Sequence, residues 1–188
     1  MNKERRPMNY NLQGKVAVVT GASRGIGEAT VRQLDAEGAN VVLVSRSKDK
    51  LAAIADELQN EALVVDCDLA ADRSIELIRI QTIEKFEKIN ILVNNAAVER
   101  NEPAHRATAK AIDETLLVNL RQAFMLCQIF AKDLFATQGN IVNVTSTAAA
   151  GAGGTQGAYA ASKGGLNTLT KNLSNEWASK GMRVNACA

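Results

Sequence analysis

With 188 residues, the chain is long enough for one sizeable hydrophobic core and too short for two ordinary domains. Its composition is that of a globular protein, with 46% hydrophobic and 22% charged residues. A net charge of +2, from 22 basic and 20 acidic residues, excludes the strongly basic surface typical of nucleic-acid-binding proteins.

Short apolar segments alternate with longer segments of helical periodicity along the chain. The apolar segments predict strands over Val16–Val19, Val41–Val44, Ala62–Val65, Ile91–Val93, Ile141–Val144 and Arg183–Ala186. The segments between them predict helices over Ile26–Glu37, Lys48–Leu58, Asp72–Phe86, Ile112–Phe135 and Ala158–Ser179. Strands that are apolar throughout are buried on both faces, which is typical of a parallel sheet covered by helices. We therefore expect one α/β domain, a Rossmann-like doubly wound parallel sheet, over residues 12–188, after an N-terminal extension of residues 1–11.

A glycine-rich turn, Thr20–Gly27, directly follows the first predicted strand. Its three glycines allow the backbone to approach a pyrophosphate, and the next helix begins with unpaired N–H groups that bind phosphate. A P-loop would require Gly-Lys-Ser/Thr, which Gly27-Glu28-Ala29 does not supply. Simple chain reversal is the other explanation, but the position after a buried strand favours a dinucleotide. The predicted contacts are Gly21, Ala22, Ser23, Arg24, Gly25, Ile26 and Gly27.

The end of the second predicted strand carries Ser45-Arg46. Enzymes that use NAD usually have an acidic residue here, which binds the ribose 2′-hydroxyl. Arg46, together with Arg24 of the glycine turn, offers guanidinium groups that suit a 2′-phosphate. The alternative is that both arginines are solvated surface residues. The pattern favours NADP(H), with Ser45 and Arg46 near its ribose.

Tyr159 and Lys163 are four residues apart in a predicted helix, so they share a face. A free tyrosine has a pKa of about 10, and a nearby ammonium lowers such a pKa by stabilising the phenolate. Ser146 follows the strand 141–144 at the ligand-binding edge of the sheet, where its hydroxyl can hold a substrate oxygen. Each feature alone is more often a solvated helix face or a helix cap. Together, at the edge of a nucleotide-binding fold, they indicate a catalytic site.

These motifs, taken in order, resemble those of the short-chain dehydrogenase/reductase family, including its 3-oxoacyl-carrier-protein reductases. The resemblance extends from about Leu12 to the last residue. The segment Asn94-Asn95-Ala96-Ala97 matches the family's Asn-Asn-Ala-Gly element except at Ala97. The other matching motifs are the glycine turn, Asp68-Leu69, Asn119, Ser146 and Tyr159-x-x-x-Lys163.

The resemblance implies a role for each of these residues. Tyr159 acts as general acid in reduction and general base in oxidation, and Lys163 lowers its pKa and binds the nicotinamide ribose. Ser146 stabilises the substrate oxygen, and Asn119 holds a water in a proton relay to Lys163. The further cofactor contacts that the resemblance implies are Asp68, Leu69, Asn94 and Ala96. Relatives usually form tetramers through two long helices, so a homo-oligomer, a tetramer or dimer, is expected.

The sequence departs from the family at its C-terminus. Members continue after Arg-Val-Asn-Ala with a Pro-Gly turn, a substrate lid and a seventh strand, whereas this sequence ends at Ala186-Cys187-Ala188. We therefore expect a C-terminally short form that lacks the usual last strand and lid, most simply a fragment of a longer enzyme.

Two functions remain open at this stage. The first is an NADP(H)-dependent oxidoreductase that interconverts a carbonyl and an alcohol on a small molecule by hydride transfer. The alternative is a truncated, non-catalytic NADP(H)-binding or interaction protein. The intact Ser146, Tyr159 and Lys163 favour the enzyme, and the short C-terminus favours the alternative. The substrate cannot be read, since the family selects it mainly through the segment that is absent.

The location of the protein is inferred from what the sequence lacks. No apolar run approaches the roughly 18 residues of a membrane span, and Met1–Tyr10 lacks the apolar core of a secretory signal. Three widely spaced cysteines predict reduced thiols in a cytoplasmic protein. The single His105 has no Cys or His neighbour at ligand spacing, so no metal site is expected.

Overall fold

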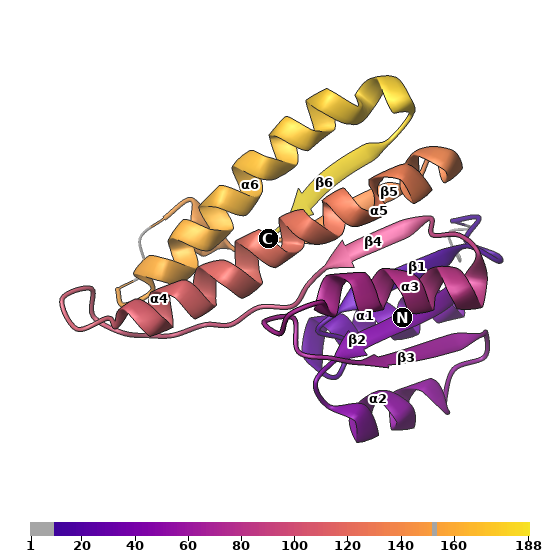
Figure 1. Ribbon diagram of the computed structural model, residues 1–188, viewed down its shortest axis with the longest axis horizontal. Helices are drawn as coiled ribbons and strands as arrows, with labels where there is room; N and C mark the ends of the chain where they lie inside the picture. The colour runs from indigo at the N-terminus through magenta and orange to yellow at the C-terminus, as the bar shows by residue number, and fades with distance from the viewer. Residues whose placement is uncertain (1–9, 152–153) are drawn as a thin grey trace, which may run out of the picture.

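The computed structural model describes residues 10–151 and 154–188, so most of the expected extension lies outside the described residues. Its centre is a six-stranded sheet in the order β3-β2-β1-β4-β5-β6 (Figure 1). Every neighbouring pair is parallel. The strands are β1 (Val16–Thr20), β2 (Asn40–Ser45), β3 (Ala62–Asp66), β4 (Ile91–Asn94), β5 (Asn140–Val144) and β6 (Arg183–Cys187). The predicted Rossmann-like α/β fold is therefore confirmed, with the reversal of strand order between β1 and β4, where such folds bind ligands.

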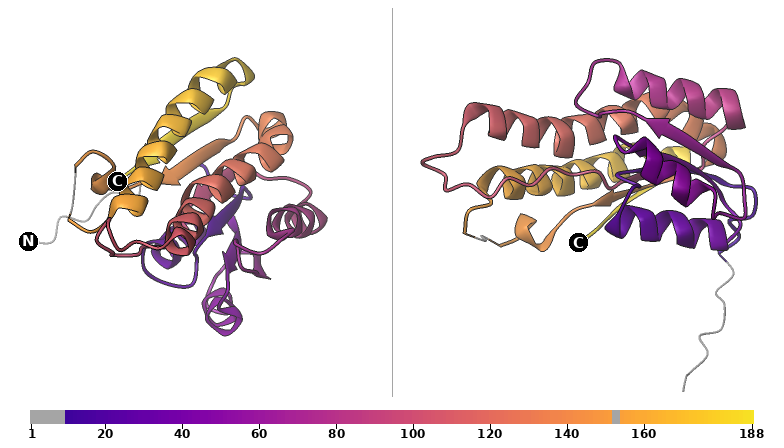
Figure 2. Two further views of the ribbon diagram at one scale, coloured as in Figure 1. Left: turned by 60° about the vertical axis from the view of Figure 1, so that its left-hand side comes forward. Right: turned by 90° about the horizontal axis from the view of Figure 1, so that it is seen from below.

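Helices cover both faces of the sheet. They are α1 (Gly25–Ala36), α2 (Lys48–Ala55), α3 (Ser74–Phe86), α4 (Ala109–Leu116), α5 (Ala123–Thr137) and α6 (Gly157–Trp177), with short 3-10 turns at Thr147–Ala149 and Ala178–Lys180. One core cluster joins Ala17 and Val19 of β1 to α1 and α2, and the other joins Val16 and Val18 to α3, α5 and α6. Alternate residues of a strand point to opposite faces, so β1 feeds both cores. Figure 2 (right) shows α1 and α3 on opposite sides of the sheet.

The predicted helix Ile112–Phe135 is not one continuous α-helix. It begins earlier, as α4, and passes into α5 through a π-helical segment, Leu117–Gln122. Figure 1 shows α6 running alongside α4 and α5. The π turn contains Asn119, which lies on this shared side of the sheet.

Asp35 holds the end of α1 to the turn before β3, and its removal is expected to destabilise the protein. Its carboxylate is 5% exposed and accepts backbone N–H groups of Gln59, at 3.0 Å, and Asn60, at 2.8 Å. Burial opposes ionisation, but these hydrogen bonds outweigh it, so the pKa of Asp35 lies below its usual value. Asp35→Asn should lower the free energy of unfolding by about 1–3 kcal/mol in chemical denaturation at neutral pH.

The loss of stability caused by Asp35→Asn should be largest near neutral pH and should shrink as the pH falls. Because the folded pKa is depressed, the stabilisation is present above the unfolded pKa of about 3.9 and is lost as the pH falls through the folded value. Asp56→Asn is a matched control, since Asp56 is exposed at the end of α2. An equal loss in both variants, or a loss independent of pH, would contradict the proposed role of Asp35.

Candidate active site

The glycine turn after β1 is fixed by Asn95, which directly follows β4. The side-chain amide of Asn95 donates to the carbonyl oxygens of Thr20, at 2.8 Å, and Gly21, at 3.3 Å. In return, Thr20 Oγ1 accepts the backbone N–H groups of Asn95 and Ala96, both at 3.0 Å. The turn and the end of β4 therefore form one rigid unit at the strand reversal.

Two glycines show why the turn needs this composition. A Cβ on Gly27 would lie 2.2 Å from the carbonyl oxygen of Gly21, so the first turn of α1 can come this close only with glycine. Gly25 has a φ of +58° in the left-handed region, and a Cβ there would meet no atom within 4 Å. The open side of the turn therefore leaves its backbone accessible to a phosphate at the N-terminus of α1.

A cleft of about 530 Å³ lies beside this turn, at the carboxyl ends of β1 to β4. Its volume is that of an ordinary ligand site. The predicted cofactor residues that line it are Gly21, Ser23, Arg24, Gly25, Ile26, Gly27, Ser45, Arg46, Asp68, Leu69 and Ala96. Residues that the sequence analysis did not select also line it, among them Ser47, Lys50, Cys67, Asn95, Ala97, Val98, Glu114 and Val118.

Two predicted contacts, Ala22 and Asn94, are not among the residues that line the cleft. Ala22 is fully buried, and Asn94 is 4% exposed. The amide of Asn94 donates to Asn143 Oδ1 at 2.9 Å, so it braces β4 against β5. As the last residue of a strand buried on both faces, Asn94 points into the core, whereas Asn95, just beyond it, faces the glycine turn.

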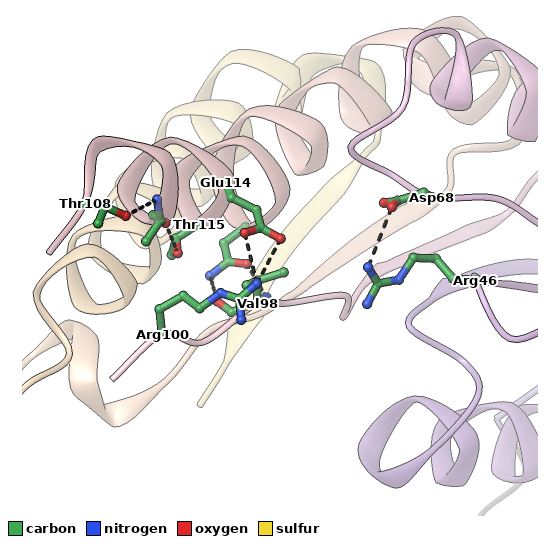
Figure 3. A network of polar contacts seen from close by, with 9 residues as sticks. Arg46, Asp68, Val98, Arg100, Thr108, Glu114 and Thr115 are labelled. Carbon is green, nitrogen blue, oxygen red and sulfur yellow. Dashed lines mark hydrogen bonds and ion pairs between the residues drawn. The ribbon is translucent and has the colours of Figure 1, made fainter. Parts of the chain in front are cut away.

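Arg46 and Asp68 face each other at the outer end of the cleft (Figure 3). Arg46 Nη1 lies 3.6 Å from Asp68 Oδ2, and the two side chains are 70% and 45% exposed. An ion pair this long and this exposed contributes little to stability. Asp68 therefore holds the guanidinium only weakly, and most of the Arg46 side chain is open to an anion.

Lys163 is the buried charge of the site. It is 2% exposed, and its Nζ donates to the carbonyl oxygen of Val144, at the end of β5, at 2.7 Å. Nζ also lies 5.8 Å from the centroid of the Tyr159 ring, which is half-buried on the same helix. Burial lowers the pKa of Lys163 to about 8, although a thiolate at Cys187 would act in the opposite direction. Tyr159 and Lys163 thus lie side by side on α6, at the carboxyl edge of the sheet.

Ser146 lies two residues beyond Val144, at the same edge. Its Oγ accepts the backbone N–H of Ala148 at 3.2 Å and so caps the 3-10 turn Thr147–Ala149. Ser146 is thus a helix cap, the alternative role given above for this residue. Accepting this bond leaves the hydroxyl proton available for donation to a substrate oxygen.

Asn119 joins the cleft to the helix that carries Tyr159. It is 1% exposed; its Oδ1 accepts the N–H of Val98 at 2.7 Å, and its Nδ2 donates to Val98 O at 2.8 Å and to Ser162 Oγ at 3.1 Å. Val98 lines the cleft, and Ser162 is adjacent to Lys163. The π turn, a feature often found at functional sites, aims this amide inward.

The family follows from a sequence match over nearly the whole chain. The family model described as short chain dehydrogenase matches residues 15–188. The chain belongs to this family. The sequence resemblance stated above is thereby confirmed, and short-chain dehydrogenases use a nicotinamide cofactor to interconvert carbonyls and alcohols on small molecules.

Individual relatives agree with this assignment. The chain is 35% identical to an NAD-dependent glycerol dehydrogenase of Listeria innocua, over 95% of this chain and 70% of the relative. It is 33% identical to a 3-oxoacyl-[acyl-carrier-protein] reductase of Rickettsia bellii, over 95% of this chain and 73% of the relative. A metagenomic short-chain oxidoreductase solved in complex with NADP is 37% identical, with a TM-score of 0.89 over 93% of this chain and 81% of that one.

No helix within 10–151 and 154–188 is long and apolar enough to cross a membrane. Within the same ranges, no group of three His, Cys, Asp or Glu side chains is arranged to hold a metal ion.

Proposed function

We propose that this short-chain dehydrogenase is an NADP(H)-dependent oxidoreductase that reduces a small-molecule carbonyl, or oxidises the corresponding alcohol, with Tyr159 as general acid and base. The observation that carries the proposal is the buried Lys163 ammonium, 5.8 Å from the Tyr159 ring and bonded to the end of β5, at the same edge of the sheet as the cleft that contains Arg24 and Arg46. A buried cation is costly, and its place beside a titratable ring is typical of a catalytic site.

The cleft fits a dinucleotide phosphate. The open backbone around Gly25 suits the pyrophosphate, and Arg24 and Arg46 suit the 2′-phosphate by charge and geometry. Asp68, Leu69 and Ala96 also line the cleft, where Asp68 and Leu69 would contact the adenine and Ala96 would approach a ribose. The bound nicotinamide would supply or accept the hydride.

The residues of the chain would manage the proton and the developing charge. Ser146 would donate a hydrogen bond from its hydroxyl to the substrate oxygen, and Tyr159 would transfer the one proton that this oxygen gains in reduction. Lys163 would stabilise the resulting phenolate and bind the nicotinamide ribose. The amide of Asn119 is engaged with Val98 and Ser162, so a water in the relay to Lys163 would have to use its backbone.

Two further features belong to the proposal. The chain would form a homo-oligomer, a dimer or tetramer joined through α5 and α6, as the family resemblance implies, and Phe124 of α5, which is 46% exposed, would lie at that interface. A cytoplasmic location is supported by three free cysteines, at positions 67, 127 and 187.

NADPH is expected to bind about tenfold or more tightly than NADH, as measured by nicotinamide fluorescence. Arg46→Ala should remove most of this preference by weakening NADPH binding about tenfold, because a charge-assisted contact with phosphate is lost. NADH binding should change little. Arg32→Ala is the matched control, since Arg32 lies on α1 and pairs with Glu28 and Glu57 outside the cleft.

Equal affinity of the wild-type chain for NADH and NADPH would contradict the assignment of NADP(H). NADPH binding without turnover of any carbonyl would favour the alternative function, a non-catalytic binding protein.

A further inference from the structure

The first turn of α2 carries two cations at the end of the helix where cations are unfavourable. Ser47 is the N-cap, and Lys48, Asp49 and Lys50 follow within the first turn, so the favourable Asp49 is flanked by two cations. The partial positive charge of a helix N-terminus repels cations and favours anions. Helix stability therefore does not account for Lys50, and its surroundings supply the reason for a cation there.

Lys50 lines the cofactor cleft, whereas Lys48 does not. Ser47 lines it too, and its hydroxyl makes no capping hydrogen bond to α2. The backbone N–H of Ser47 is bound by Ser45 Oγ at 3.1 Å, which fixes the path from β2 into the helix. At the end of β2 the cleft is thus lined by Ser47 and Lys50 as well as by Arg46.

Some charged side chains that line the cleft form ion pairs and others do not. Arg46 faces Asp68 at 3.6 Å, and Glu114 is held by Arg100 at 3.0 Å (Figure 3). Among the described residues, Arg24 and Lys50 take part in no ion pair. The uncompensated positive charge of the cleft therefore comes from these two residues, since Asp68 and Glu114 each have a cationic partner.

We propose that Lys50 is a specificity-determining residue whose ammonium, together with the Ser47 hydroxyl, binds the 2′-phosphate of NADP(H) beside Arg24 and Arg46. This inference rests on the proposed use of NADP(H) and deepens it. Arg46 shares its positive charge with Asp68, 3.6 Å away, on the side where the adenine would lie. Lys50 therefore supplies a further positive charge for the 2′-phosphate. A 2′-hydroxyl carries no charge, so Lys50 contributes to NADP(H) binding and not to NAD(H) binding.

The test compares Lys50→Gln with Lys48→Gln, a matched change on the same turn outside the cleft. Binding of adenosine 2′,5′-bisphosphate and of adenosine 5′-monophosphate is measured by titration calorimetry, so the nicotinamide and turnover are not involved. Lys50→Gln should weaken binding of the bisphosphate about five- to twentyfold and leave the monophosphate within twofold. Lys48→Gln should change neither by more than twofold, and Lys50→Arg should restore most of the affinity. The melting temperature of Lys50→Gln should not fall, because a cation leaves a helix N-terminus.

Three results would overturn the inference. Equal effects of Lys50→Gln and Lys48→Gln would show that Lys50 does not contact the phosphate. Equal weakening of both nucleotides would place Lys50 at the 5′-phosphate or adenine. A wild-type chain that binds the two nucleotides equally would overturn the inference together with the proposed NADP(H) preference, whereas the first two results leave that preference intact.

Discussion

Replacing Tyr159 by Phe is expected to lower kcat for carbonyl reduction by about 10²–10⁴-fold, the usual contribution of a general acid. Tyr159 lies half-buried on α6, 5.8 Å from the ammonium of Lys163, and the substitution removes only its hydroxyl. The proton must then come from water, while Ser146 and the cleft remain. The measurement is the carbonyl-dependent loss of NADPH absorbance by the wild-type and variant chains.

The other tyrosine of the chain provides the control for this variant. Tyr10 is 51% exposed and lies before β1, so Tyr10→Phe should leave kcat unchanged. NADPH binding should persist in Tyr159→Phe, because the hydroxyl is not part of the phosphate cleft. Retention of more than a tenth of the wild-type kcat by Tyr159→Phe would exclude Tyr159 as the general acid.

Lys163→Met is expected to abolish most of the activity and, at the same time, to stabilise the protein. Activity should fall at least about 100-fold, because the phenolate of Tyr159 loses its counter-charge. Burial lowers the Lys163 pKa from 10.5 to about 8, which corresponds to a cost of about 3 kcal/mol for the charged form at neutral pH. Loss of the hydrogen bond to Val144 O offsets part of this cost. Chemical denaturation at pH 7 should therefore show a net gain of about 1–2 kcal/mol.

The pKa of Lys163 determines how both the stability and the activity of the protein depend on pH. Between about pH 8 and 10.5 the unfolded chain binds more protons than the folded one, so wild-type stability rises with pH and the advantage of Lys163→Met shrinks. Carbonyl reduction by the wild-type chain should weaken as the pH rises through about 8, since Lys163 loses its charge. Two results together would contradict this role of Lys163 as a buried catalytic cation. They are a Lys163→Met variant less stable than the wild-type chain, and a rate of carbonyl reduction that does not change with pH.

The sequence was sufficient to predict the six strands and the glycine turn. Strands β1, β2 and β4 are apolar runs buried on both faces, and the turn must have glycine where a Cβ would lie 2.2 Å from Gly21 O. The side-chain directions after β4 were not predictable, because Asn94 and Asn95 are identical adjacent residues. Only the structure separates Asn94, which braces β5, from Asn95, which holds the glycine turn.

The π-helical segment 117–122 and the position of Lys50 in the cleft both depend on tertiary packing, which the spacing of apolar residues in the sequence does not predict. The segment 117–122 has ordinary apolar helical spacing, and its π turn appears only where the Asn119 side chain meets Val98 and Ser162. Lys50 is one of two exposed lysines in the first turn of α2, and nothing in its sequence neighbours distinguishes it from Lys48. Its place in the cleft is set by the path from β2 into α2.

Carbonyl-dependent oxidation of NADPH, followed with the wild-type chain and a panel of ketones and aldehydes, tests the central claim most directly. We expect the wild-type chain to reduce at least one carbonyl, and to do so faster with NADPH than with NADH. Tyr159→Phe should stop the reaction. Tight NADPH binding with no carbonyl-dependent oxidation, or a rate that Tyr159→Phe leaves unchanged, would contradict this claim.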